Sequence, residues 1–223
     1  MEGKGERRKV EGIIFDLDGT LVDSIEDISD AANLMLRSNG YGIHKVEDYL
    51  NWIGNGAARL IEAALPPGLS NDLLDKLVKE FKSNYRNNIH EKTRIYDGIP
   101  ELLDFLNQSG LVLSILSNKP DELTREVVNW YLSGWTFNTV FGQREGIPRK
   151  PDPAAALEIS GLMGIDAEKI LFVGDSKNDM VTARAGGFIP VGVSWGYGSG
   201  EGLLEGGAEF VIHQPDALKE LIT

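Results

Sequence analysis

Short apolar runs recur along the chain and end in small or acidic residues. They lie at residues 10–16, 111–117, 139–142, 170–175, 189–194 and 209–212. Apolar runs of this length, bounded by turn-forming residues, are typical of strands that are buried on both faces. Between most of them the apolar residues have helical spacing, as at 100–110, Ala154–Met163 and 176–185. Strands that alternate with helices predict an α/β fold with a parallel sheet covered on both sides.

The segment from residue 24 to residue 90 interrupts this alternation, because it has helical spacing and no convincing strand. Helices are expected at Ile25–Ser38, at 56–65 and at 70–87, with Ser24 and Ser70 placed to cap two of them. The segment is too long for a loop. We therefore predict an all-helical domain, residues 22–94, inserted after the first strand of an α/β core formed by residues 1–21 and 95–223.

The acidic excess of the chain limits its partners. The 223 residues include 22 Lys and Arg against 34 Asp and Glu, which gives a formal net charge of −12. A charge of this sign repels nucleic-acid phosphates and anionic lipid, so we expect neither nucleic acid nor a membrane surface as a partner. The chain has no Cys and therefore has no disulfide and no thiolate site, which fits a reducing compartment.

The start of the chain predicts a cytoplasmic protein. Residues 1–9 are polar, and the apolar run at 13–15 meets Asp16 far too soon for a signal peptide or a membrane span. We therefore expect a soluble protein of the cytoplasm, either a monomer or a homodimer.

Acidic residues gather at the predicted strand ends. Asp16 and Asp18 follow the first strand, and Asp175 and Asp179 follow the fourth. Asp16 and Asp18 alone are equally well explained as turn or helix-cap residues. In an open parallel sheet, however, ligands bind outside the carboxyl ends of the strands, where these four carboxylates would converge and repel one another. Oxygen ligands without His or Cys suit Mg²⁺, which usually shares its coordination sphere with a substrate phosphate.

Two further side chains match a phosphate at this edge of the sheet. Ser117 ends the second strand, and Lys150 lies in an Arg-Lys-Pro-Asp-Pro segment before the fourth. A phosphoryl group in transfer spreads negative charge over its oxygens and needs donors around them. Alone, Ser117 is explained more simply as a turn cap and Lys150 as a surface lysine. The order and placement of all the pieces favour phosphoryl transfer.

These motifs resemble those of the haloacid dehalogenase-like (HAD) superfamily of phosphohydrolases, in its members with a helical cap after the first strand. The resemblance covers nearly the whole chain, and its motifs correspond to residues 16–20, Ser117, Lys150 and 174–179. It implies a Rossmann-like core with an inserted cap domain. True haloacid dehalogenases lack the equivalent of Asp18, so the resemblance implies phosphate chemistry rather than C–Cl hydrolysis.

The resemblance also implies roles for the residues. Asp16 would attack the phosphorus and form an aspartyl phosphate, and Asp18 would act as general acid and then as general base. Mg²⁺ would be held by the Asp16 carboxylate, the Asp18 backbone carbonyl and Asp175. Asp179 would contact the metal directly or through water, or would orient Lys150. The phosphoryl oxygens would be bound by Ser117, Asn118 and Lys150.

Three stretches of the chain, residues 52–60, 96–103 and 195–198, most resemble the phosphoglycolate phosphatases. This implies a small phosphorylated metabolite as the substrate, with 2-phosphoglycolate first among them. Its non-phosphate end would face Asn55, Gly56 and Arg59. The simpler alternative is a glycine-rich link between two helices, with Arg59 on a solvated helix face.

Three other functions stay open on the sequence. A pyrophosphatase or nucleotidase of the same superfamily would have the same core motifs, and so would an intramolecular phosphotransferase of the β-phosphoglucomutase kind. The non-enzymatic alternative is a binding protein that retains the fold, although such a protein has no need of both a nucleophile and an acid.

Overall fold

Six parallel strands form the sheet that the apolar runs predict. The computed structural model describes residues 9–222, so the first eight residues of the predicted core and Thr223 lie outside the described residues. Within them, the strands are ordered β5-β4-β1-β6-β7-β8 across the sheet. Their bounds are β1 (Gly12–Phe15), β4 (Val112–Pro120), β5 (Thr139–Gln143), β6 (Ile170–Gly174), β7 (Ile189–Val193) and β8 (Phe210–Ile212). The predicted α/β fold class is confirmed.

Strand β1 lies at the centre of the sheet and is fully buried. It pairs with β4 on one side and β6 on the other, and Phe15 lies level with Ile115 and Val173. Phe15 packs into the hydrophobic cluster on one face of the sheet, while Ile14 packs into the cluster on the other. Burial on both faces explains why the strands appear as continuous apolar runs. The parallel register also brings the carboxyl ends of β1, β4 and β6 side by side.

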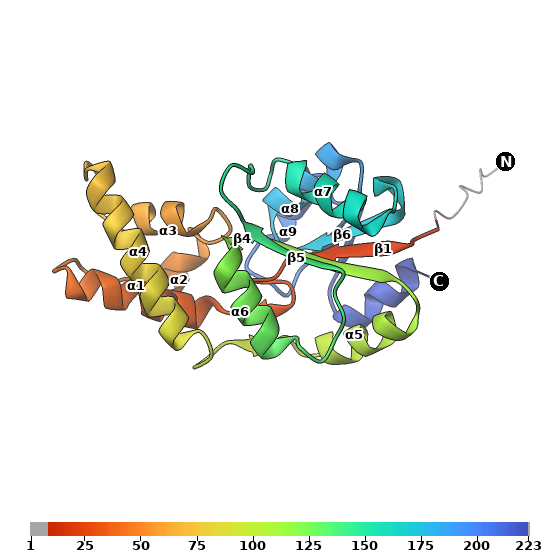
Figure 1. Ribbon diagram of the computed structural model, residues 1–223, viewed down its shortest axis with the longest axis horizontal. Coiled ribbons are helices and arrows are strands. Elements are labelled where there is room, and N and C mark those ends of the chain that lie inside the picture. Colours follow the sequence, from red (N-terminus) through yellow and green to blue (C-terminus); the bar gives the residue numbers. More distant parts are fainter. Residues whose placement is uncertain (1–8, 223) are drawn as a thin grey trace.

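Helices cover both faces of the sheet (Figure 1). On one face, α7 (Ala154–Met163) and α8 (Lys177–Gly186) pack into the cluster that contains Ile14. On the other lie α5 (Ile99–Gln108), α6 (Asp121–Tyr131) and the 3-10 segment η2 (Pro215–Leu221). The short helix α9 (Gly200–Glu205) packs beside α8, and a 3-10 turn, η1 (Ala167–Lys169), leads into β6.

Strand β4 is longer than the sequence predicts. We expected it to end at Ser117, because polar residues follow, but Asn118 and Lys119 remain in the strand, and Pro120 pairs with Gln143 after a shift in register. The side chains of residues 117–119 are all buried. Their polarity therefore marks a site at the edge of the sheet rather than the end of the strand.

The four helices between residues 24 and 90 lie together beyond one end of the sheet (Figure 1). They are α1 (Ile25–Ser38), α2 (Val46–Leu50), α3 (Ala57–Ala63) and α4 (Asn71–Asn88). As expected, the described residues contain no strand in this interval. Helix α1 packs along α4, and α4 also contacts α3. No helix in the described part of the chain combines the length and apolar character needed to cross a bilayer.

The two predicted serine caps have different outcomes. The Ser70 hydroxyl accepts a hydrogen bond from the Leu73 N–H at 3.3 Å, so Ser70 caps α4 as expected. Ser24 precedes α1, but its side chain caps nothing, and this prediction is wrong. Its hydroxyl donates instead to Asp18 Oδ1 at 2.5 Å, while the Ser24 N–H donates to the Tyr197 hydroxyl at 2.7 Å. A residue far along the chain thus replaces the local cap.

A two-stranded antiparallel ribbon connects the sheet to the four helices. Strand β2 (Val22–Asp23) pairs with β3 (Arg94–Ile95), so the segments that enter and leave the helical part run side by side. The sequence analysis missed this ribbon, because two-residue strands have no periodicity. Next to it, the buried Asp27 carboxylate of α1 accepts hydrogen bonds from the N–H groups of Lys92 and Thr93 at 3.0 and 2.8 Å. The Thr93 hydroxyl donates to it at 2.6 Å. Asp27 therefore fastens α1 to the returning segment.

Asp27→Ala is expected to lower the free energy of unfolding by about 3 kcal/mol, because it leaves buried N–H and hydroxyl donors without an acceptor. Asp30→Ala is the matched control on the same helix. Asp30 is exposed, and its ion-pair partner in the described part of the chain is the Lys92 ammonium, at 2.7 Å, so its loss should matter far less. Urea unfolding of both variants checks this, and equal losses would contradict the role of Asp27.

Candidate active site

The carboxyl ends of the central strands meet at a cavity of about 130 Å³, on the edge of the sheet that faces the four helices. Asp16 and Asp175 directly follow β1 and β6, and Ser117 lies near the end of β4. Lys150 comes from the connection between β5 and α7. These four residues and Asp18 all line the cavity. The structure thus brings together the polar residues that the sequence analysis identified at separate strand ends.

Lys150 is buried between two carboxylates. Its Nζ atom lies 2.8 Å from Asp16 Oδ1 and 2.6 Å from Asp179 Oδ1, and it donates to the Leu116 carbonyl at 3.0 Å. Burial alone would lower the pKa of Lys150, but the two carboxylates outweigh burial and raise it above its usual value. Lys150 is therefore a permanent positive charge, and each of its three donor protons has a partner.

The Asp179 carboxylate is held by contacts to both of its oxygens. Oδ1 accepts from Lys150, while Oδ2 accepts from the Ser176 N–H at 3.0 Å and from the Ser176 hydroxyl at 2.5 Å. The Ser176 hydroxyl in turn accepts from the Asp179 N–H, which completes a capping box at the start of α8. Asp179 is fully buried and does not line the cavity. Its carboxylate caps α8 and orients Lys150.

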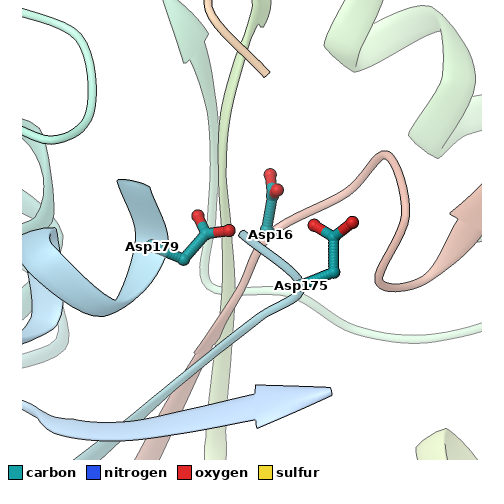
Figure 2. A group of neighbouring side chains, drawn as sticks. All are labelled: Asp16, Asp175 and Asp179. Carbon is teal, nitrogen blue, oxygen red and sulfur yellow. The ribbon is translucent and has the colours of Figure 1, made fainter. Parts of the chain in front are cut away.

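Asp16, Asp175 and Asp179 form a buried group of carboxylates (Figure 2), in which one oxygen of each lies within 4.8 Å of the others. Burial, and after it repulsion from Asp179, raises the pKa of Asp16 well above its ordinary value and that of Asp175 to about 7. Asp175 accepts hydrogen bonds from the Tyr197 and Gly198 N–H groups and has no ion pair within residues 9–222. A buried carboxylate without a counter-charge fits a bound cation, and an oxygen-only ligand set suits Mg²⁺.

Asp18 belongs to a different ion pair. Its Oδ1 atom accepts hydrogen bonds from Lys119 Nζ at 2.6 Å and from the Ser24 hydroxyl at 2.5 Å. Lys119 Nζ also donates to the hydroxyl of Tyr85, in α4, at 2.8 Å. This series of contacts runs from the sheet edge to the helical segment and holds Asp18 in place.

In Asp16 and Asp18 alike, one oxygen is anchored and the other is not. Asp16 Oδ1 accepts from the Leu17 N–H at 2.7 Å as well as from Lys150. Within residues 9–222, neither Asp16 Oδ2 nor Asp18 Oδ2 has a hydrogen-bond partner. Each carboxylate is therefore oriented by the protein and keeps one oxygen available for another molecule.

Ser117 and Asn118 are neighbours with different roles. The Ser117 hydroxyl lines the cavity and accepts a hydrogen bond from the Lys119 N–H at 3.1 Å. The Asn118 side chain donates to the carbonyls of Gly54 and Lys150 at 2.8 and 2.9 Å and accepts from the Lys150 N–H at 2.9 Å. Both donor protons of Asn118 are thus used within the protein. Asn118 fastens the Lys150 segment to the helical part rather than offering its amide to a substrate.

The three residues predicted to face the substrate from the helical segment do not lie together. Gly56 lines the cavity, but Asn55 is exposed, and its Oδ1 atom accepts from Asn178 at 3.1 Å. The side chain of Arg59 is 61% exposed and binds Glu62 at 2.6 Å, one turn further along α3. The buried residues of α3 are Leu60 and Ile61, and residue 59 lies on the solvated face of the helix. The structure therefore agrees with the simpler alternative for Arg59.

The sequence analysis missed Lys119, Tyr85 and Tyr197 at this site. Lys119 had a usable signal, since it follows Ser117-Asn118 directly at a strand end. Tyr85 occupies an apolar position of α4 and is nearly indistinguishable from a core aromatic residue. Tyr197 is 173 residues from Ser24, to which it is hydrogen-bonded, so no local pattern could connect them.

Comparisons with known proteins find phosphatases among the relatives of this chain, which agrees with the phosphate chemistry that the cavity residues suggest. A phosphoglycolate phosphatase of Pseudomonas fluorescens is 35% identical over 215 residues, which cover 94% of this chain and 78% of the relative. One of Aliivibrio fischeri is 32% identical, with 93% and 91% covered. The crystal structure of a predicted phosphoglycolate phosphatase from Haemophilus somnus superposes with a TM-score of 0.90 at 26% identity, covering 98% of this chain and all of the other. A protein of Lactobacillus delbrueckii superposes with a TM-score of 0.86 at 28% identity, covering 96% and 98%.

The family comparison covers both the sheet and the helical segment. The model of the haloacid dehalogenase-like hydrolases matches residues 13–193, an interval that contains every carboxylate and lysine of the cavity. The relatives extend this match to nearly the whole chain. The chain therefore belongs to the haloacid dehalogenase-like hydrolase family.

Proposed function

We propose that this chain is a Mg²⁺-dependent phosphomonoester hydrolase that works through an aspartyl phosphate on Asp16. The observation that carries the proposal is the pair of anchored aspartates in one cavity. Asp16 and Asp18 each have one oxygen held by a lysine, at 2.8 and 2.6 Å, and a second oxygen without a partner in the described part of the chain. The available oxygen of Asp16 suits a nucleophile, and that of Asp18 suits a group that gives and takes a proton.

In the first step, the available oxygen of Asp16 attacks the phosphorus, and the bond from phosphorus to the ester oxygen breaks. Protonated Asp18 gives its proton to the departing alkoxide, so the leaving group departs as a neutral alcohol. The fixed charge of Lys150 and the Ser117 hydroxyl stabilise the negative charge that spreads over the phosphoryl oxygens.

In the second step, ionised Asp18 takes a proton from a water molecule, whose oxygen attacks the phosphorus of the aspartyl phosphate. The bond between phosphorus and Asp16 breaks, which restores the carboxylate and releases inorganic phosphate. Lys119 and Ser24 hold the other oxygen of Asp18 through both steps, so we regard them as positioning residues.

The buried carboxylates support the proposed metal. Asp16, Asp175 and the backbone carbonyl of Asp18 are the ligands that we propose. Asp179 orients Lys150 instead, because it is fully buried and, unlike Asp16 and Asp175, does not line the cavity. When bound, Mg²⁺ neutralises charge between the carboxylates and the phosphate. The support for it is Asp175, which is buried without a counter-charge in the described part of the chain.

We also propose that residues 22–94 act as a cap over a core formed by 1–21 and 95–223, of which the described residues begin at 9. The β2–β3 ribbon carries both connections between the two parts. Residues of α1, α3 and α4 contribute walls to the cavity. Closure of such a cap excludes water while the phosphorus is attacked, and opening releases the product.

We propose 2-phosphoglycolate as the first substrate to test, because the relatives that match nearly the whole chain are named phosphoglycolate phosphatase. The volume of about 130 Å³ agrees with a small metabolite. The reaction products distinguish this phosphatase function from the phosphotransferase, pyrophosphatase and nucleotidase alternatives. Glucose 1-phosphate converted to the 6-phosphate without phosphate release would indicate a phosphotransferase, and cleavage of pyrophosphate or nucleotides alone would indicate the other hydrolases.

Asp16→Asn is expected to lower kcat for 2-phosphoglycolate at least about 10⁴-fold, because an amide is a poor nucleophile. The side chain keeps its shape and Lys150 keeps its ion pair with Asp179, so the variant should still fold, which its melting transition checks. Phosphate release at equal protein concentration measures the effect. Substantial remaining turnover would exclude Asp16 as the nucleophile.

Mg²⁺ is expected to raise the melting temperature of the wild type, because a ligand that binds only the folded state stabilises it. Asp175→Asn should abolish this rise and, in EDTA, should melt higher than the wild type, since it removes a buried charge that has no ion-pair partner in the described part of the chain. Asp166→Asn is the control, because Asp166 is exposed, and it should keep the full Mg²⁺ effect. An undiminished effect in the Asp175 variant would refute the ligand set.

Arg59→Ala is expected to leave the KM for 2-phosphoglycolate within about twofold of the wild type, because an exposed ion pair contributes little. Its guanidinium binds Glu62 and does not line the cavity. Initial rates with 2-phosphoglycolate and with a neutral aryl phosphate check this. A selective rise in KM of more than about tenfold for the carboxylated ester would mean that Arg59 contacts the substrate.

A further inference from the structure

The cavity has a polar end and an apolar end. The carboxylates, Lys150 and Ser117 occupy the end at the sheet edge, whereas the wall formed by residues 28–81 consists of hydrocarbon side chains and of two glycines, Gly54 and Gly56. Those that line it are Ile28, Leu50, Ile53, Ala57, Leu60 and Phe81. Leu123 of α6 adds a further apolar surface from the sheet side. A leaving group attached to a phosphate near Asp16 would lie against this wall.

The wall offers no free charge to a polar leaving group. Among the described residues that line the cavity, the cations are Lys119 and Lys150, and each is already paired with a carboxylate at 2.6 to 2.8 Å. Arg59 is bound to Glu62 at the surface. The Tyr85 hydroxyl is engaged by Lys119. A hydroxyl group placed against this wall would therefore lose water without gaining an equivalent partner, whereas a hydrocarbon segment there has no hydrogen bond to lose.

The apolar chamber is the part of the cavity lined by Ile28, Leu50, Ile53, Ala57, Leu60, Phe81 and Leu123. We propose that this chamber binds a compact hydrocarbon leaving group, so that short alkyl phosphomonoesters form a further substrate class of this site. The inference rests on the proposed phosphomonoesterase function but not on 2-phosphoglycolate as the substrate. A dry apolar cavity of about 150 Å³ holds a benzene molecule. The cavity here, at about 130 Å³, must also receive the phosphoryl group. The chamber thus accepts a chain of about two to four carbons.

The series of methyl, ethyl, propyl and butyl phosphate tests the chamber on the wild-type protein. The longer alcohols of the series have nearly the same pKa, so the P–O bonds of their phosphate esters are about equally easy to break. The esters then differ mainly in the amount of hydrocarbon that can be buried. Each methylene that enters the chamber should lower KM about fourfold until the chamber is full. A KM that stays flat along the series would overturn the proposal, and this comparison needs no variant to fold.

Ala57→Leu tests where the alkyl chain lies. Ala57 lines the cavity, while Ala58, the next residue of α3, is exposed and provides the matched control as Ala58→Leu. Leucine is a good helix former, so neither change should unwind α3. Ala57→Leu should raise the KM for propyl phosphate about sixteenfold and leave that for methyl phosphate within about twofold, because the new side chain displaces the two methylenes that propyl phosphate has beyond methyl phosphate. Ala58→Leu should change neither. Equal effects of the two variants would contradict the assigned wall.

The experiment separates failure of the chamber from failure of the proposed function. If 2-phosphoglycolate and methyl phosphate are hydrolysed but KM does not fall from methyl to butyl phosphate, the proposed role of the chamber is wrong and the phosphomonoesterase function stands. No phosphate release from any of these esters, with Mg²⁺ present and the protein folded, would overturn the phosphomonoesterase function and the chamber with it.

Discussion

One buried ammonium group organises the site. Lys150 is positioned by Asp179 and by the Leu116 carbonyl, and it holds Oδ1 of Asp16. Asp179 also caps α8, and Asn118 fixes the Lys150 backbone to β4. Removing one partner from such a buried pair typically costs about 3 to 5 kcal/mol, because the other charge is left uncompensated. The start of α8, the end of β4 and the position of Asp16 therefore depend on one another.

The arrangement also explains how a chain with a net charge of −12 can receive an anionic ester. The two cavity lysines are paired, and the Asp175 carboxylate has no ion-pair partner in the described part of the chain, so under the proposed function a bound cation supplies the positive charge that attracts the phosphate. Mg²⁺ is suited to that task. The charged groups are concentrated at the sheet edge, while the helical segment supplies hydrocarbon. Under the proposals above, phosphate recognition and leaving-group recognition therefore belong to different parts of the chain.

Much of the fold follows from the sequence, because strands buried on both faces and amphipathic helices have strong periodic signals. The convergence of Asp16, Ser117 and Asp175 follows from the rule that parallel strands share a carboxyl edge. Side-chain partners do not follow in this way. Ser24 has the sequence of an N-cap but binds Asp18, because Tyr197 reaches its N–H from a distant loop. Arg59 pairs with Glu62 on the solvated face of α3, because Leu60 and Ile61 form the buried face of this helix.

The most direct test of the account is to locate the phosphoryl group during turnover. The enzyme, quenched in acid while it hydrolyses 2-phosphoglycolate or an alkyl phosphate with Mg²⁺, should yield one peptide with an added phosphoryl group, the peptide that contains Asp16. The modification should be lost on treatment with hydroxylamine, as expected of an acyl phosphate. A phosphoryl group found on Ser117, stable to hydroxylamine, or turnover with no modified peptide at any time, would contradict the central claim that Asp16 is the nucleophile.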